Sequence, residues 1–232
     1  MNISEPKMRV ELHLHTCYSL DSLLSIETMI DRARELGIDR LAVTDHNEIE
    51  GALAAQKLAP ELIIVGEEIQ TTVGELLGYF MTEKIPEGLE PEEVLRRLKD
   101  QGAVISVAHP FDRRGGIAWE WEQLADLSPM LDAVEVFNAR CLSQEFNQRA
   151  QAFADEFGLS GTVGSDAHSA VELGTAILSM TAFQSADDFR EALKSGTAAV
   201  KPSPPYVRLY SRHAKMTKKW HQTLDSASES EK

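Results

Sequence analysis

Short apolar runs alternate with amphipathic segments along most of the chain. Apolar runs rich in β-branched residues predict strands at 9–15, 40–45, 62–69, 103–109, 133–137 and 160–166. Between them, apolar residues recur with the spacing of one helix face at 25–37, 89–102, 143–158 and 185–196. Because strands that alternate with helices usually form a parallel sheet covered by helices, this order predicts an α/β fold.

Two regions depart from this alternation. The segment "QTTVGELLGYF" at 70–80 is interrupted by Gly74 and Gly78, so it predicts a hairpin rather than a helix. The sequence shows neither an internal repeat nor a linker, and we expect a single domain at 8–205. A basic segment at 206–221 should pack on or near this domain, whereas the polar tail at 222–232 has little to bury and should be disordered.

The composition narrows the classes of function. A hydrophobic content of 43% with 26% charged residues is typical of a globular protein with a substantial core. The net charge of −14 disfavours a nucleic-acid partner, although carboxylates that bind metal ions would also make a chain look acidic. With two cysteines, no secretory leader pattern and no apolar run long enough for a membrane helix, we expect a cytoplasmic protein.

Histidines and carboxylates gather where predicted strands end. His13 and His15 lie two positions apart, so an extended chain points both imidazoles to one face. In a parallel barrel, residues from the carboxyl ends of the strands converge on one side. Imidazole with carboxylate suits Zn, Mn or Fe, and the number of candidates favours two or three ions over one. The set comprises His13, His15, Asp21, Asp45, His46, Glu67, Glu68, His109, Asp166 and His168.

A serine-hydrolase triad is the alternative use of such histidines. Ser106 and Ser165 lie near suitable strands, but the chain has no G-x-S-x-G turn. Five histidines at strand ends also exceed what a triad needs. The metal interpretation is therefore favoured.

Five motifs in order, "ELHLHTCYSLDS", "AVTDHN", "VGEEI", "VAHPFD" and "TVGSDAH", resemble the polymerase and histidinol phosphatase (PHP) family of metal-dependent phosphoesterases. The resemblance implies a distorted (β/α)7 TIM-like barrel with a metal cluster at the carboxyl ends of the strands. It implies one ion at His13, His15 and Asp166, a second at Asp21, His46 and His168, and a third at His109. The family's G-x-E pattern selects Glu68, rather than Glu67, as the bridging carboxylate.

The chain departs from the family pattern at the third ion. Relatives with a full third site often carry a further histidine shortly after the bridging glutamate, and this chain has none there. Either Glu75 substitutes for it, or the third site is weak or empty. Asp21 also lies one residue later than in the common form of the first motif.

The resemblance implies hydrolysis of a small phosphorylated metabolite or nucleotide through a metal-activated water. Arg113 and Arg114 are candidates to clamp phosphate, with solvated surface charge as the alternative, and Asn138 is a candidate to hydrogen-bond substrate. Asp45 either orients a histidine or caps a turn. Two other functions stay open, an exonuclease or polymerase-associated module and an amidohydrolase-type C–N hydrolase.

Overall fold

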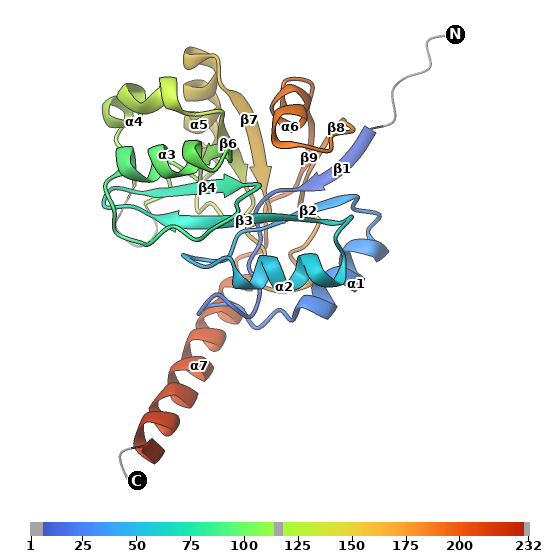
Figure 1. Cartoon of the computed structure of the whole chain (residues 1–232), viewed down its shortest axis with the longest axis vertical. Coiled ribbons are helices and arrows are strands. Elements are labelled where there is room, and N and C mark those ends of the chain that lie inside the picture. Colours follow the sequence, from blue (N-terminus) through green and yellow to red (C-terminus); the bar gives the residue numbers. More distant parts are fainter. Residues whose placement is uncertain (1–6, 114–117, 230–232) are drawn as a thin grey trace.

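The computed structural model describes residues 7–113 and 118–229 (Figure 1). It is a single-domain α/β fold built on a nine-stranded sheet with the order β7-β6-β5-β4-β3-β2-β1-β8-β9. The strands are β1 (Lys7–Glu11), β2 (Arg40–Val43), β3 (Ile63–Gln70), β4 (Glu75–Tyr79), β5 (Val104–Val107), β6 (Ala133–Asn138), β7 (Ser160–Gly164), β8 (Ala176–Thr181) and β9 (Thr197–Val200).

The strands from β1 to β7 curl into a nearly closed barrel. The chain leaving β1 meets the chain leaving β7 through a parallel bridge between Leu14 and Ala167. Two main-chain hydrogen bonds hold this junction, from Asp166 N to His13 O at 2.8 Å and from His15 N to Ala167 O at 2.8 Å. The TIM-like barrel expected from the sequence is thus confirmed, and its closure lies beside two of the predicted metal ligands.

The helices begin and end at the signals that the sequence carries. Ser25 caps its helix by accepting a hydrogen bond from Thr28 N, and Ser185 with Asp188 forms a capping box. Gly158 ends another helix with φ of 65°, a left-handed conformation that suits glycine. The helices are α1 (Ile26–Glu35), α2 (Glu50–Leu58), α3 (Pro91–Asp100), α4 (Trp121–Leu127), α5 (Gln144–Phe157), α6 (Ala186–Leu193) and α7 (Val207–Glu229).

The prediction of a parallel sheet is wrong for part of the structure. The expected hairpin at 70–80 is present as the antiparallel pair β3–β4, and β4 also pairs with β5 in the antiparallel sense. On the other side, β8 pairs antiparallel with β1 and with β9. Because the pairing of β1 with β8 joins segments far apart in the chain, the local apolar pattern does not reveal its direction.

Helix α7 extends beyond the predicted basic segment. It runs to Glu229, where the sequence predicted disorder from residue 222, and 230–232 lie outside the described residues. Adding residues to an existing helix costs far less than nucleating one, so a polar sequence can continue a helix that is already formed. Figure 1 shows its far end projecting away from the barrel. Among the described residues, none of the helices is both long and apolar enough to cross a membrane.

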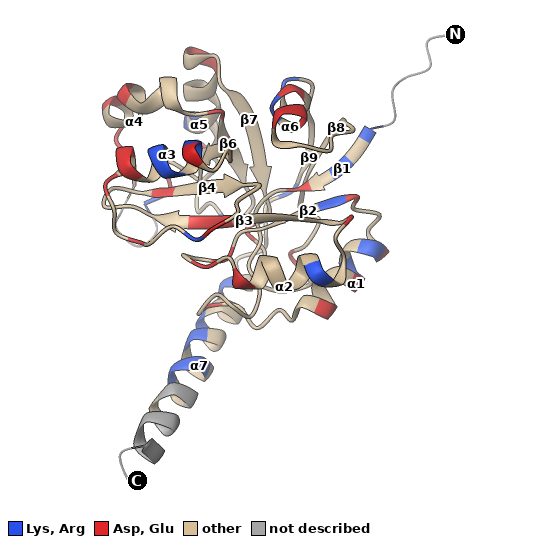
Figure 2. Cartoon of the chain, viewed as in Figure 1, with Lys and Arg blue, Asp and Glu red and all other residues tan. Residues whose placement is uncertain are grey.

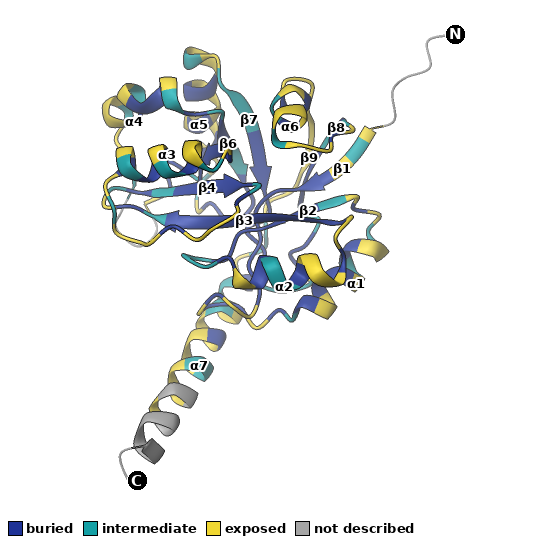
Figure 3. Ribbon diagram, viewed as in Figure 1, coloured by how far each residue is buried: buried dark blue, intermediate teal, exposed yellow. Residues whose placement is uncertain are grey.

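The alternation along β3 sends two neighbouring glutamates to opposite sides. Ile63, Val65 and Ile69 belong to the larger apolar core, whereas Ile64 belongs to a second core. Glu67 therefore points to the side of Ile63 and Val65, where its Oε2 accepts a hydrogen bond from Ile85 N at 3.0 Å. Glu68 points to the side of Ile64, which leads toward the histidines. The buried strands appear dark blue in Figure 3.

Burial of Glu67 makes the stability of the fold dependent on pH. Burial raises its pKa from 4.5 to about 7, so between these values the folded chain retains a proton that the unfolded chain releases. The free energy of unfolding should therefore fall as the pH rises through this window. In urea unfolding, Glu67→Gln should gain up to about 3 kcal/mol over the parent at pH 8 and much less at pH 5. A gain that is equal at both pH values, or that exposed Glu92→Gln also shows, would contradict this assignment.

Candidate metal centre

The structure brings all eight predicted metal ligands to one end of the barrel. They lie on the chain leaving β1, after β2, within β3, after β5 and after β7, and thus mostly where strands end. Four groups have ligand atoms within 4.8 Å of one another. These groups are His15 with His46 and His168, His13 with His109 and Asp166, His13 with His15 and Glu68, and His46 with Glu68 and Glu75.

Glu68 lies at the centre of this cluster. Its Oε2 is 3.3 Å from the Nε2 atoms of both His13 and His15 and 2.9 Å from Nδ1 of His46. Its Oε1 is 3.0 Å from Nε2 of His109. The side chain is fully buried. Through its two oxygens this single carboxylate contacts four imidazoles. This is the position that a carboxylate bridging several ions requires.

Asp166 and Asp21 extend the cluster on one flank. Oδ1 of Asp166 lies 3.2 Å from Nε2 of His15, and Oδ1 of Asp21 lies 3.3 Å from Nε2 of His168. The other oxygen of Asp21 is 3.6 Å from Nε2 of His46. The group of Asp21, His46 and His168 expected from the resemblance is therefore close in space.

Glu75 joins the cluster from the opposite flank. Its Oε2 is 3.5 Å from Nε2 of His109, and a ligand atom of Glu75 groups with His46 and Glu68. Glu75 begins β4, which the hairpin turn brings back beside the end of β3. Of the two sequence alternatives for the third ion, this placement favours Glu75 as a substitute ligand.

Buried polar atoms without partners show that the donor set fits divalent ions. Nε2 of His13, Nε2 of His15, Oδ1 of Asp21 and Oε2 of Glu68 are buried and, although they lie close to one another's groups, form no hydrogen bond with the described residues. Leaving such atoms unsatisfied costs free energy, and native proteins rarely do so. Nitrogen and carboxylate oxygen are the ligands that Zn, Mn and Fe accept, so ions held here would satisfy these atoms.

The electrostatics of the cluster keep its carboxylates ionised. Although burial favours the neutral form, the imidazoles of His13 and His46 hold the pKa of Glu68 well below its usual range. Asp166 shows the same direction, with the pKa lowered against burial by His13, His15 and His168. Burial, then the charges of His168 and His46, lower the pKa of His15 to about 3. Ionised carboxylates and a neutral imidazole are the forms that bind metal ions.

Glu135 holds two of the histidines in place. Its Oε1 is 2.8 Å from Nδ1 of His13, and its Oε2 accepts a hydrogen bond from the main-chain N of His109 at 2.8 Å. Glu135 lies in β6 and is almost fully buried. Because a carboxylate on Nδ1 leaves Nε2 to point into the cluster, Glu135 fixes the orientation of His13 as a ligand. Sequence reasoning missed this role.

Replacing Glu135 should weaken metal binding without removing a ligand. We expect Glu135→Gln to reduce metal affinity by about 10–100-fold, the usual effect of losing a carboxylate behind a ligating histidine. Competition with a chromogenic chelator measures this affinity. Glu122→Gln, at an exposed position of α4, is the matched control and should bind metal like the parent. An unchanged affinity in Glu135→Gln would contradict the assigned role.

Asp45 orients the loop that follows β1. It is fully buried, and burial raises its pKa. Its Oδ1 accepts hydrogen bonds from Thr16 N at 2.7 Å and from Ser19 Oγ at 2.6 Å. The same Ser19 hydroxyl lies 3.3 Å from Nδ1 of His15 and accepts from His46 N at 3.0 Å. Asp45 thus supports two histidines through Ser19, which favours its orienting role over a turn cap.

Two predicted ligands have strained backbone conformations. His109 has φ of 24° and Asp166 has φ of 53°, backbone angles that residues other than glycine rarely adopt. Hydrogen bonds from their main-chain N atoms, to Glu135 and to His13 O respectively, hold them there. Backbone strain of this kind gathers at functional sites, where the surrounding contacts compensate for it.

The predicted substrate residues are placed differently from the ligands. Arg113 is exposed, pairs with Glu120 at 2.9 Å and does not line the cleft beside the cluster. Arg114 lies outside the described residues. Asn138 is fully buried, and its Nδ2 donates to Glu135 at 3.1 Å and to Asp166 at 3.4 Å. Asn138 therefore supports the cluster rather than facing an open cleft.

A cleft of about 390 Å³ opens onto the cluster and has a basic wall. One side presents the candidate ligands Asp21, His46, Glu75, His109, Asp166 and His168. The other side presents Arg140, Arg208, Ser211, Arg212 and Lys215. Arg140 follows β6, and the remaining four come from α7, where Figure 2 colours the Lys and Arg positions of the ribbon blue. One signal in the sequence points to them, a basic segment in an acidic chain.

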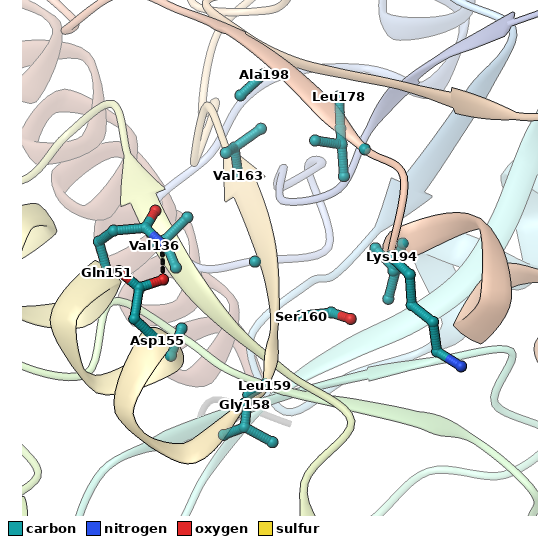
Figure 4. A pocket seen from close by; sticks show the side chains of 14 residues that line it. Val136, Gln151, Asp155, Gly158, Leu159, Ser160, Val163, Leu178, Lys194 and Ala198 are labelled. Atoms are coloured by element: carbon teal, nitrogen blue, oxygen red, sulfur yellow. Dashed lines mark hydrogen bonds between the residues drawn. The ribbon is translucent and has the colours of Figure 1, made fainter.

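A second hollow lies elsewhere on the molecule. It measures about 550 Å³ and is lined by residues such as Val136, Gln151, Ser160 and Lys194 (Figure 4). None of the clustered ligands lines it. The hollow next to the histidines is therefore the candidate site, although it is smaller.

Comparisons with known proteins agree with this geometry. The PHP domain family matches residues 11–118, and the PHP-associated family matches residues 144–198. An uncharacterised protein of Methanocaldococcus jannaschii, MJ1587, is 37% identical over 145 residues, which is 57% of this chain and 82% of that protein. A DNA polymerase III of the PolC type from Staphylococcus epidermidis is 28% identical over 141 residues, 59% of this chain and 8% of that protein.

Among solved structures, a two-domain protein from Bacteroides vulgatus is described as containing a predicted PHP-like metal-dependent phosphoesterase. It matches with a TM-score of 0.69 at 21% identity, covering 84% of this chain and 65% of that one. The fold and the cluster define a TIM-like barrel with a candidate metal centre at one end. The family matches make the identity more specific, and the chain belongs to the PHP family.

Proposed function

We propose that this protein is a phosphatase that hydrolyses a monoester of a small phosphorylated molecule with two or three ions of Mn, Fe or Zn. The observation that carries the proposal is the contact of one carboxylate, Glu68, with four imidazoles at the floor of a cleft with a basic wall. Divalent ions in such a site neutralise phosphate charge and lower the pKa of a water. A PHP domain at 8–205, with 206–221 attached to it, is part of this proposal.

Different groups of residues in the site have different roles. Histidines and carboxylates in β3 and on the chain after β1, β2, β5 and β7 would hold the ions, while Glu135 and Asp45 keep these side chains in position. Guanidinium and ammonium groups on the opposite wall offer hydrogen bonds to an anion that enters the cleft. A cleft of about 390 Å³ is within the range of small-molecule sites.

A nuclease is the second candidate function. The similarity to a PolC-type protein favours it, since the name of that protein is DNA polymerase III. The basic side chains of α7 would suit a nucleic-acid strand, but the chain as a whole has a net charge of −14. We therefore place the monoester phosphatase first.

The two functions are separated by their substrates. Metal-loaded protein should release phosphate from p-nitrophenyl phosphate, and it should act far more slowly on bis(p-nitrophenyl) phosphate and on a labelled oligonucleotide. His13→Ala should abolish this turnover while circular dichroism shows a folded chain. Faster cleavage of the diester or of the oligonucleotide would favour the nuclease. Turnover that persists in metal-stripped protein would rule out both.

A further inference from the structure

Helix α7 is attached to the metal-binding end of the barrel by polar contacts. Arg208 Nη2 donates to Arg140 O at 2.7 Å, and Arg140 Nη2 donates to Ser211 Oγ at 2.8 Å. Lys218 Nζ donates to the main-chain oxygens of Cys17, at 2.6 Å, and of Ser19. These contacts attach α7 to the loops after β1 and β6, both of which carry site residues.

Apolar burial contributes little to this attachment. Within the part of α7 whose side chains are described, Val207 and Ala214 are the buried apolar residues. Leu209, Met216 and Trp220 are exposed on the helix. The helix is therefore placed by charge and hydrogen bonds, which suits a role in the cleft better than a role in the core.

The face of α7 toward the cleft carries three basic residues and one serine. Arg208, Ser211, Arg212 and Lys215 follow the i, i+3, i+4, i+7 spacing of one helix face, and all four line the cleft. The sequence from 207 to 224 contains no acidic residue, in a chain whose net charge is −14. Such a local reversal of charge at the mouth of a cleft attracts anions.

The acidic partners of these groups are few. Arg212 is exposed and makes no hydrogen bond or ion pair among the contacts that the described residues form. Lys215 pairs with Asp21 at 3.2 Å, but Asp21 is a predicted metal ligand. When Asp21 binds an ion, Lys215 has to share its carboxylate with that ion. By contrast, Arg140 forms an ion pair with Glu172, in which Nε of Arg140 lies 3.1 Å from Oε1 of Glu172.

We propose that α7 is the substrate-binding wall of the cleft and selects molecules that carry a second anionic group beside the scissile phosphate. The ions take the scissile phosphate, and Arg212 and Lys215 take the second group, a phosphate or a carboxylate. The inference rests on the proposed phosphatase function, since it assigns the substrate class of the same site. It extends that function because a monoester with no second anionic group would leave the positive charges of Arg212 and Lys215 without an anionic partner from the substrate.

Calorimetric titration of metal-loaded protein with three compounds of one carbon skeleton tests the inference. The compounds are glycerol 3-phosphate, 3-phosphoglycerate and 2,3-bisphosphoglycerate, which carry no second anion, a carboxylate, and a carboxylate with a phosphate. We expect the second and third to bind at least about tenfold more tightly than the first, as one charge-assisted contact would provide. A gain already present with 3-phosphoglycerate identifies a carboxylate site, and a gain only with the third compound identifies a phosphate site.

Variants on α7 assign the preference to this helix. Arg212→Gln and Lys215→Gln should each reduce the preference for the phosphoglycerates over glycerol 3-phosphate by about tenfold. Lys219→Gln, an exposed lysine of the same helix that does not line the cleft, should behave like the parent. Circular dichroism and metal content of each variant confirm that fold and cluster are intact.

The outcomes separate this inference from the phosphatase proposal. Equal binding of all three compounds, or an equal loss of preference in Lys219→Gln, would overturn the role of α7. If the preference and its loss in Arg212→Gln are observed but neither p-nitrophenyl phosphate nor the two phosphoglycerates are hydrolysed, α7 is an anion-binding wall and the phosphatase function fails. If hydrolysis occurs without any preference, the phosphatase stands and the inference fails.

Discussion

Glu68→Gln should abolish phosphate release and lower the metal content of the protein. Glutamine keeps the shape of the side chain but removes the charge that contacts His13, His15 and His46 through one oxygen. Without a bridging carboxylate the ions lose a shared ligand, and we expect kcat/KM for p-nitrophenyl phosphate to fall by at least about 1,000-fold. Phosphate release and elemental analysis of the same sample measure the two effects.

The neighbouring residue supplies a matched control. Glu67→Gln makes the same chemical change one position earlier, on the side of β3 that faces away from the cluster. It should keep full metal content and activity. If Glu68→Gln retained metal and turnover, or if Glu67→Gln lost both, the position assigned to the bridging carboxylate would be wrong.

Metal binding should stabilise the fold strongly. The cluster gathers carboxylates from distant parts of the chain and buries polar atoms without partners, so ions bind the folded chain in preference to the unfolded one. An ion present at 1,000 times its dissociation constant adds about 4 kcal/mol to the free energy of unfolding. For a chain of this size we expect Mn²⁺ to raise the Tm of chelator-treated protein by about 10 °C in differential scanning calorimetry.

The Glu68→Gln variant is also the control for this measurement. It should show a much smaller increase in Tm, because its ligand set is incomplete. An equal increase in parent and variant would mean that the stabilising ions bind elsewhere. The absence of any increase in the parent would contradict a preformed metal centre.

The convergence of the candidate ligands could be predicted from sequence because strand geometry is local. Two histidines at alternate positions share a face of an extended chain, and the ends of parallel strands meet at one end of a barrel. The same alternation separates Glu68 from Glu67, as the contacts of β3 confirm. These features need only the pattern of a few residues around each strand.

The roles of Glu135 and Lys218 could not be predicted because these residues act over long distances in the chain. Glu135 contacts His13 across 122 positions, and the helix that carries Lys218 contacts Cys17 across 201. The position of Arg113 directly after a ligand suggested a phosphate clamp, but the side chain turns to Glu120. Adjacency in sequence does not set the direction of an exposed arginine, whereas strand alternation sets the direction of a buried histidine.

The most direct test of the metal centre is elemental analysis of protein purified without chelator. We predict two or three equivalents of Mn, Fe or Zn per chain, with phosphate release from p-nitrophenyl phosphate by the same sample. Loss of both after treatment with chelator, and recovery after Mn²⁺ is restored, would complete the result. Less than one equivalent of metal, even after reconstitution, would contradict the assignment of His13, His15, Glu68 and their neighbours as a polynuclear metal site.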